Sequence, residues 1–178
     1  MNTAVSPKLL LVDEPSYTFG SQDNAHSYSA EFNLAKESHP TSIHGLFLDG
    51  MPHLVIGAAG GCSGVHTHSL SVVAARAYVA VGDQVVCLRS DTLEVLWSRA
   101  VDDATCFGVH FSEEHQALIS HGELSIARLT SEGQIAWQSY GADIFSGSFS
   151  LRPDAVLATD FEGRVYRFNY ADGREAAI

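Results

Sequence analysis

The chain has 178 residues, of which 46% are hydrophobic and 17% charged, a composition typical of a folded globular protein and not of a disordered one. Its net charge is −11, and only Lys8 and Lys36 are lysines. The sequence lacks the clustered cations that bind a phosphate backbone, which argues against nucleic acid and anionic membranes as partners. We find neither a signal-peptide pattern nor an apolar run of about 20 residues, so we expect a soluble, cytoplasmic protein.

Residues 1–26 are predicted to be an N-terminal extension with one short strand at the apolar run 9–12. Residues 27–178 have almost no helical period and alternate apolar with polar residues, which predicts an all-β domain. Its first unit is the least regular. We expect 27–35 to be the strand that enters this unit, and the glycine-rich segment 57–67 to replace its outer strand.

The same order of strands then recurs along the chain. Segments with the pattern of a second strand are 43–48, 69–74, 106–111 and 145–151. Third-strand segments are 53–57, 77–82, 117–120 and 155–160, and outer-strand segments are 84–88, 123–129 and 164–168. Turn residues close each unit in the segments SDTLE, TSEGQ and ADGRE.

The spacing between these units is close to 40 residues. Trp97 is followed by Trp137 (137 − 97 = 40), and Gly133 by Gly173 (173 − 133 = 40), whereas Leu93 holds the equivalent place one unit earlier. Such a period is typical of a β-propeller blade and predicts a small or partial propeller of about four blades. We predict that both tryptophans are largely buried between blades, because aromatic side chains dominate core packing.

The spacing is not uniform, because Leu88 and Leu129 are 41 residues apart and Leu129 and Phe168 are 39 apart. A shift of one residue would turn a strand's side chains to the opposite face of its sheet unless a turn or bulge absorbs it. We therefore expect local irregularities near these positions.

The segments DTLEVLW, SEGQIAW and EGRVYRFNYADGRE resemble the repeat of quinoprotein-like (PQQ-like) β-propellers, which are related to the WD40 architecture. The resemblance is closest over 71–178 and weaker over 27–70. It implies a repeat type, and the family includes large dehydrogenases that carry a quinone cofactor. This chain has about four units and no adjacent-cysteine pair, so that cofactor is not carried over. We expect no cofactor, with zinc as the one exception considered.

Residues 57–68, GAAGGCSGVHTH, form the most unusual segment of the sequence. Glycines let a backbone turn sharply or approach a ligand closely, which makes candidate ligand-binding residues of Gly60, Gly61, Cys62, Ser63 and Gly64. Two histidines two residues apart point to one side of a strand, so Cys62, His66 and His68 are candidate zinc ligands. The alternative is a structural glycine loop with partly exposed histidines. His44, His110 and His121 lie at or beside strands and could converge.

Other polar residues have simpler interpretations. Ser63 lacks the G-x-S-x-G context of a nucleophile elbow, because Val65 stands where the last glycine belongs. Asp102 and Asp103 are expected to be solvated turn residues, and Asp160 to form hydrogen bonds in a turn of its blade. Cys87 and Cys106 are expected to be buried.

The function that these patterns favour is a non-catalytic ligand- or protein-binding or assembly module. The alternative is a small metal-dependent enzyme that uses the loop 57–68. We expect self-association as a homodimer, because an arc of about four blades leaves sheet edges and terminal faces open. Alternatively, the run 9–12 could pair with the last blade and close the ring within one chain. A protein or a small molecule is the other partner considered.

Overall fold

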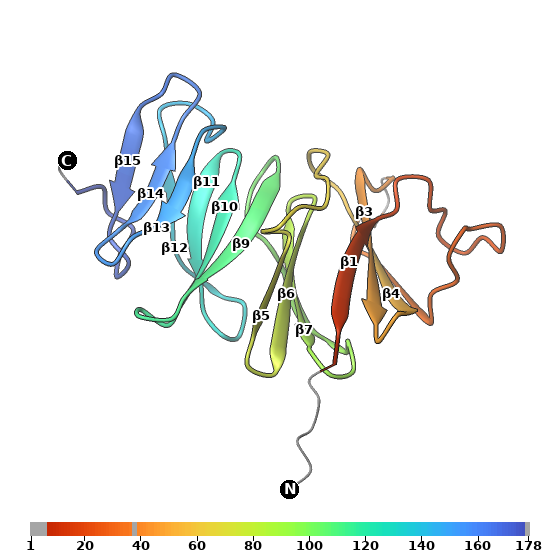
Figure 1. The fold of residues 1–178 in the computed structure, drawn as a ribbon. Helices are drawn as coiled ribbons and strands as arrows, with labels where there is room; N and C mark the ends of the chain where they lie inside the picture. Colours follow the sequence, from red (N-terminus) through yellow and green to blue (C-terminus); the bar gives the residue numbers. More distant parts are fainter. Residues whose placement is uncertain (1–6, 37–38, 177–178) are drawn as a thin grey trace, which may run out of the picture.

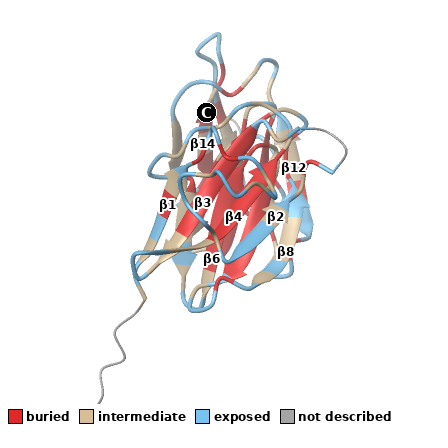
Figure 2. Cartoon of the chain, turned by 90° about the vertical axis from the view of Figure 1, so that its right-hand side faces the viewer, coloured by how far each residue is buried: buried red, intermediate tan, exposed pale blue. Residues whose placement is uncertain are grey.

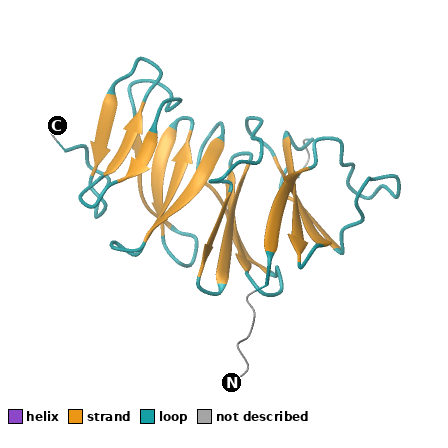
Figure 3. Cartoon of the chain, viewed as in Figure 1, coloured by secondary structure: helices purple, strands orange, loops and turns teal. Residues whose placement is uncertain are grey.

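Four separate β-sheets lie side by side in an open row (Figure 1). The computed structural model describes residues 7–36 and 39–176, and in this part of the chain every regular element is a strand (Figure 3). The predicted all-β, propeller-like fold is confirmed. The described residues contain no helix long and apolar enough to cross a membrane.

Each sheet is built from strands that are consecutive in the chain. The first sheet contains β1 (Leu9–Asp13), β2 (Ala30–Asn33), β3 (Ser42–Leu48) and β4 (Met51–Ala58), and the second contains β5 (Leu70–Val73), β6 (Arg76–Val81), β7 (Gln84–Arg89) and β8 (Val95–Ala100). The third sheet contains β9 (Cys106–Ser112), β10 (Ala117–Gly122), β11 (Ser125–Leu129) and β12 (Ile135–Tyr140). The last contains β13 (Phe149–Leu151), β14 (Val156–Thr159) and β15 (Val165–Phe168).

The second and third sheets are regular antiparallel blades in which each strand pairs with the next along the chain. The outer pair of each sheet has an irregular register, between Cys87 and Leu88 in one and between Arg128 and Leu129 in the other. These positions are where the repeat spacing departs from 40. Both bulges lie at the same place in their blades, so the one-residue shift is absorbed in the turn that follows. The Leu93 N–H donates to the Arg89 carbonyl, four residues earlier, whereas the Gly133 N–H donates to the Thr130 carbonyl, three residues earlier, and the apolar residues keep facing the core.

The first sheet differs from the expected blade. Its order is β1-β3-β4-β2, and β2 runs parallel to β4. The segment 27–35 was expected to enter the blade, but its strand lies at the outer edge, on the same side of the molecule as β8 and β12 (Figure 2). β1 pairs with β3 over its full length, from Leu9 with Leu48 to Asp13 with His44. Closure of the ring by pairing of 9–12 with the last blade is therefore wrong. Residues 1–6 of the predicted extension lie outside the described residues.

Within the described residues the last sheet has three strands, and a single bridge between Phe168 and Glu175 occupies the place of a fourth. It lies at the opposite end of the row from the first sheet (Figure 1). The chain thus forms an arc with two terminal faces.

Apolar side chains fill the spaces between neighbouring sheets and hold the row together. Trp97 and Trp137 take equivalent places in this packing: the indole Nε1 donates to the Ser131 carbonyl in the first case (2.9 Å) and to the Tyr170 carbonyl in the second (2.8 Å). Trp137 is buried as predicted. Trp97 is less completely buried and packs against the core between the second and third sheets.

A glycine lies under each tryptophan. A Cβ at Gly133 would come within 2.5 Å of the Trp97 ring, and a Cβ at Gly173 within 2.5 Å of Trp137. Both glycines have positive φ, and so does Leu93, with φ of 58°, at the equivalent turn of the preceding blade. A residue with positive φ at this place is therefore common to the three blades, while glycine is required only where an indole ring covers the backbone.

The two terminal faces of the arc are not alike. Over the first sheet, Tyr17, Phe19 and Tyr28 from the segment between β1 and β2 pack on Ile43 and Val55. Partly buried hydrogen bonds hold this segment, because the Tyr28 hydroxyl donates to Glu14 (2.6 Å) and the Tyr17 hydroxyl to Glu31 (2.7 Å). The first blade thus carries its own cap.

Candidate functional site

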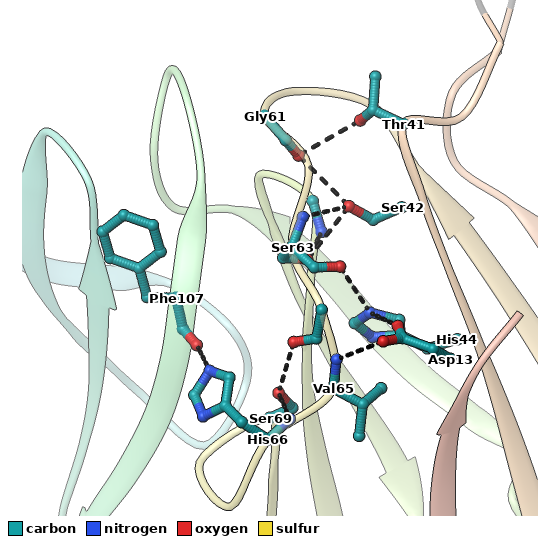
Figure 4. A network of polar contacts seen from close by, with 12 residues as sticks. Asp13, Thr41, Ser42, His44, Gly61, Ser63, Val65, His66, Ser69 and Phe107 are labelled. Atoms are coloured by element: carbon teal, nitrogen blue, oxygen red, sulfur yellow. Dashed lines mark hydrogen bonds and ion pairs between the residues drawn. The ribbon is translucent and has the colours of Figure 1, made fainter. Parts of the chain in front are cut away.

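The loop 57–68 connects the first two sheets and is held by a network of polar contacts (Figure 4). The Ser63 backbone N–H donates to the Ser42 hydroxyl (2.8 Å), and the Gly82 N–H donates to the Ser63 hydroxyl (3.0 Å). The Val65 N–H donates to the Asp13 carboxylate (3.0 Å). These contacts join the loop to β1, β3 and the β6–β7 turn, and so they fix its path.

The loop glycines are explained by contact with the neighbouring backbone. Gly60 has φ of +92°, and a Cβ there would come within 2.4 Å of the Ala104 carbonyl oxygen. A Cβ at Gly61 would lie 1.8 Å from the Thr105 hydroxyl oxygen, and the Gly61 N–H donates to the Ala104 carbonyl (2.7 Å). Glycine is needed here because the loop passes close against the segment that leads into the third sheet.

Asp13, His44 and Ser63 lie together, but their geometry does not activate a nucleophile. His44 is completely buried, and its Nε2 faces the Ser63 carbonyl oxygen (3.1 Å) and Asp13 Oδ1 (3.4 Å), not the Ser63 hydroxyl. Burial lowers the pKa of His44 below its usual value. The Ser63 hydroxyl is already bonded to Gly82 and Ser42. This cluster therefore stabilises the joint between the first two sheets.

A pocket of about 410 Å³ opens between the third and last sheets, and the second half of the loop lines one side of it. Its walls come from the loop before β5, from β9 and β10, and from the segment that leads into β13. The residues that line it are His66, His68, Phe107, Gly108, His110, His121, Phe145, Ser146 and Phe149. Its volume lies in the range of small-molecule sites.

The rings in this pocket stack on one another. His121 and Phe149 are 4.5 Å apart between centroids with planes at 12°, and His68 and His110 are 4.4 Å apart with planes at 32°. His110 also lies 4.4 Å from Phe149, which joins the two pairs. The pocket therefore has walls of aromatic faces, against which a further planar ring can stack.

Two histidines of the pocket, His110 and His121, have pKa values below that of an ordinary imidazole. Burial, with a smaller contribution from neighbouring histidines, lowers the pKa of His110 to about 3, and burial lowers the pKa of His121 to about 4. His121 Nε2–H donates to the Phe145 carbonyl (3.2 Å), and His66 Nε2–H to the Phe107 carbonyl (2.5 Å). His110 and His121 are therefore uncharged at pH 7, and each offers a nitrogen lone pair.

This burial of neutral imidazoles predicts an acid-sensitive fold. In the unfolded chain the histidines take up protons below a pKa of about 6.5, whereas in the folded chain they do so only near 3 and 4. The unfolded state thus binds more protons between these values, and the free energy of unfolding falls as the pH is lowered from about 6.5 to about 4. Urea unfolding across this range should give a shallower pH dependence for His121→Phe than for wild type. His53→Phe, on β4 and outside the pocket, should keep the wild-type slope, and an unchanged slope in His121→Phe would contradict the assignment.

Of the residues predicted from the loop, His66 and His68 line the pocket, and the structure brings His110 and His121 to them, but not His44. Cys62 is exposed. Within residues 7–36 and 39–176, no group of three or more His, Cys, Asp or Glu side chains is arranged to hold a metal ion. The remaining candidates have structural contacts. The loop passes close to Ala104 and Thr105 at Gly60 and Gly61, Ser63 is hydrogen-bonded to Ser42, and Gly64 lies beside Asp13.

The phenylalanines that line the pocket were not predicted as site residues from the sequence. Phe107, Phe145 and Phe149 belong to two second-strand segments with equivalent places in the repeat, which was the available signal. Asp102 was also misjudged. It is only 4% exposed, and its carboxylate accepts hydrogen bonds from backbone N–H groups, whereas the neighbouring Asp103 is exposed as expected. Asp160 forms the expected hydrogen bonds within its turn, to the Tyr166 hydroxyl and the Arg164 N–H.

No protein-family model and no curated protein matches the chain. Solved structures do resemble it. The computationally designed Ika4 protein aligns with a TM-score of 0.53 at 10% identity, covering 64% of this chain and 73% of that one. The computationally designed Ika8 protein gives 0.55 at 9% identity (76% and 45%), and BamB from Moraxella catarrhalis gives 0.55 at 15% identity (75% and 41%).

These likenesses, all at low identity, show an all-β, propeller-like fold. The chain spans less than half the length of the Ika8 and BamB chains that it matches.

Proposed function

We propose that this chain is a non-catalytic binding module whose ligand site is the pocket lined by His66, His68, His110, His121 and the three phenylalanines. The observation that carries the proposal is the convergence of aromatic and imidazole rings, from the loop before β5 and from the third and last sheets, on one pocket. Propeller-like scaffolds are known to support both binding and catalysis, so the argument depends on the pocket and not on the fold.

The ligand class follows from the walls of the pocket. Aromatic faces favour a planar ring, which would stack on Phe149, His121 or His110. Neutral imidazoles provide lone pairs and N–H groups but no positive charge, so they favour an uncharged ring with a hydrogen-bonding group over an anion. The ligand proposed here is therefore a neutral aromatic or heteroaromatic group, either a small molecule or the side chain of a protein partner.

The same histidines argue for binding over catalysis. A general base works best when its pKa lies near the working pH, whereas the pKa of His110 is about 3 and that of His121 about 4. Such imidazoles are weak bases. The residue that comes nearest to a nucleophile among the pocket walls is Ser146, for which the structure gives only a backbone N–H contact, to the Ile144 carbonyl.

Indole and benzoate are suitable probes, because one is a neutral ring with an N–H donor and the other a planar anion. Indole should bind saturably in calorimetry and shift the ring resonances of His110 and His121. Phe149→Ala should weaken indole at least about tenfold, since it removes the stacking wall. Benzoate should bind more weakly than indole at pH 7.

Phe32→Ala is the matched control, because Phe32 is also a partly buried phenylalanine but belongs to β2 in the first sheet. It should leave indole affinity unchanged. Absence of saturable binding by either probe, or equal losses in the two variants, would count against the pocket. A zinc titration distinguishes the metal-dependent alternative: stoichiometric zinc that is lost in His66→Ala would favour that alternative instead.

A further inference from the structure

The exposed face of the last sheet repeats a face that is buried inside the arc. In the third sheet, β10 and β11 pair Ile119 with Arg128 and His121 with Ile126. Ile119 and Ile126 are fully buried against the last sheet, and Arg128 Nη1 donates to the Tyr170 carbonyl (2.8 Å). This pattern of two aliphatic side chains and one arginine forms the joint between the third and last sheets.

The last sheet has the same pattern at the equivalent register. β14 and β15 pair Leu157 with Arg167 and Thr159 with Val165. The spacings are those of the repeat: 157 − 119 = 38, 165 − 126 = 39 and 167 − 128 = 39. The alternate residues Val156, Ala158, Tyr166 and Phe168 belong to the core shared with the third sheet. Leu157, Val165 and Arg167 therefore face away from the arc.

This face is open in the described structure. Val165 is 40% exposed and Phe161, in the adjoining turn, is 69% exposed, whereas their counterparts in the third sheet lie at a joint. The equivalence extends to the backbone. The Glu123 N–H donates to the Thr105 carbonyl of the loop before its own sheet, and the Phe161 N–H donates likewise to Ile144. The Glu123 carbonyl then accepts from Phe145 N–H of the next sheet (2.7 Å), while no hydrogen bond to the Phe161 carbonyl occurs among the described residues.

We propose that the face formed by Leu157, Val165, Arg167 and Phe161 is an interface at which two copies of this chain pair through their last blades. A head-to-tail array of copies would need the first blade as acceptor, but Tyr17, Phe19 and Tyr28 already cover that face. No such cover lies on the last blade of the described structure, so two copies can pair through their last blades about a two-fold axis, which buries the same patch on both copies.

The charge distribution favours the same contact. Residues 152–175 contain four of the ten lysines and arginines and five of the 21 acidic residues, a net charge of 4 − 5 = −1. The other residues have six cationic and 16 acidic side chains, a net charge of 6 − 16 = −10. Two copies thus repel one another least when they approach through the last blade.

Sedimentation of the full chain at physiological salt, from about 1 to about 100 μM, tests the proposal over the range in which a dimer with a micromolar Kd forms. Wild type should pass from monomer to dimer. Val165→Arg should raise the dimer Kd at least about 100-fold, because it replaces a buried apolar contact with a cation on each copy, and the two cations face one another across the two-fold axis. Val72→Arg is the matched control, since Val72 on β5 is 52% exposed and lies in another sheet, and it should leave dimerisation unchanged.

Circular dichroism and the melting temperature establish that Val165→Arg is folded; Leu157→Arg, on the neighbouring strand, takes its place if it is not. A wild-type chain that stays monomeric at about 100 μM overturns the proposal. A dimer that survives in the folded variant, or one lost equally in Val72→Arg, also overturns it, because the contact would then lie elsewhere. Indole binding at the pocket is a separate readout and should be the same in Val165→Arg and wild type.

Discussion

Replacement of Trp137 by alanine is expected to lower the free energy of unfolding by about 3–5 kcal/mol, as truncation of large buried aromatic side chains does. Trp137 is 8% exposed and packs in the core between the third and last sheets. The substitution also leaves the Tyr170 carbonyl without the indole N–H that now donates to it. Urea unfolding followed by far-UV circular dichroism measures the loss.

Trp97→Ala is the internal comparison, because it makes the same chemical change at the equivalent position of the preceding blade. Trp97 is partly exposed, so Trp97→Ala should lower the free energy of unfolding clearly less than Trp137→Ala does. Trp137→Phe should cost about 1 kcal/mol, since most of the buried ring area is kept and one hydrogen bond is lost. Equal losses for the two alanine variants would contradict the packing described between the last two sheets.

Replacement of Asp102 by alanine is expected to destabilise the chain by about 3 kcal/mol or more, because several buried donors would lose their acceptor together. Asp102 Oδ2 accepts from the backbone N–H groups of Leu124 (2.9 Å) and Ser125 (2.8 Å) and from the Ser125 hydroxyl (3.0 Å), and Oδ1 accepts from the Ala104 N–H (2.8 Å). The carboxylate thus ties the segment before β9 to the β10–β11 turn.

Asp103→Ala is the matched control, since the neighbouring aspartate is exposed and should change stability by less than about 0.5 kcal/mol. Asp102→Asn should give an intermediate loss, because the amide keeps one acceptor oxygen. The melting temperatures of the three variants, measured under the same conditions, test this role of Asp102. If Asp102→Ala and Asp103→Ala have the same melting temperature, the Asp102 carboxylate does not stabilise the contact between these segments.

Features that depend on interactions between residues close in sequence could be predicted, and features that depend on distant contacts could not. The all-β class, the blade-like repeat and the strand segments of the second, third and last sheets could be predicted, because alternation of apolar residues and turn chemistry are local signals that recur every 40 residues or so. The places of these strands within the blade were predicted wrongly: 84–88 and 123–129 were expected to be outer strands, but β7 and β11 are inner strands, and β8 and β12 lie at the edge. The departures from a spacing of 40 also marked a real difference between blades, because the turn after β11 is one residue shorter than the turn after β7.

The four strands of the first sheet fall in the predicted segments 9–12, 27–35, 43–48 and 53–57, but their pairing could not be predicted, because it is set by contacts distant in sequence. Nothing local states that β1 pairs with β3, or that β2 runs parallel to β4 at the outer edge. Asp102 was misjudged for a similar reason: an acidic residue in a turn is usually solvated, and only the approach of Ser125 makes it a buried acceptor. The cap formed by Tyr17, Phe19 and Tyr28 has no repeat period at all.

Local patterns in the sequence are sufficient to predict the repeat, the buried faces of its strands and the residue types present in the loop 57–68. The role of that loop follows from contacts between sheets, since its glycines are required by the backbone of Ala104 and the hydroxyl of Thr105, and its histidines meet His110, His121 and Phe149 from other sheets. A repeat fixes which residues are equivalent, but a pocket forms where non-equivalent residues of neighbouring units meet. That meeting depends on how the sheets pack against one another, which no local pattern encodes.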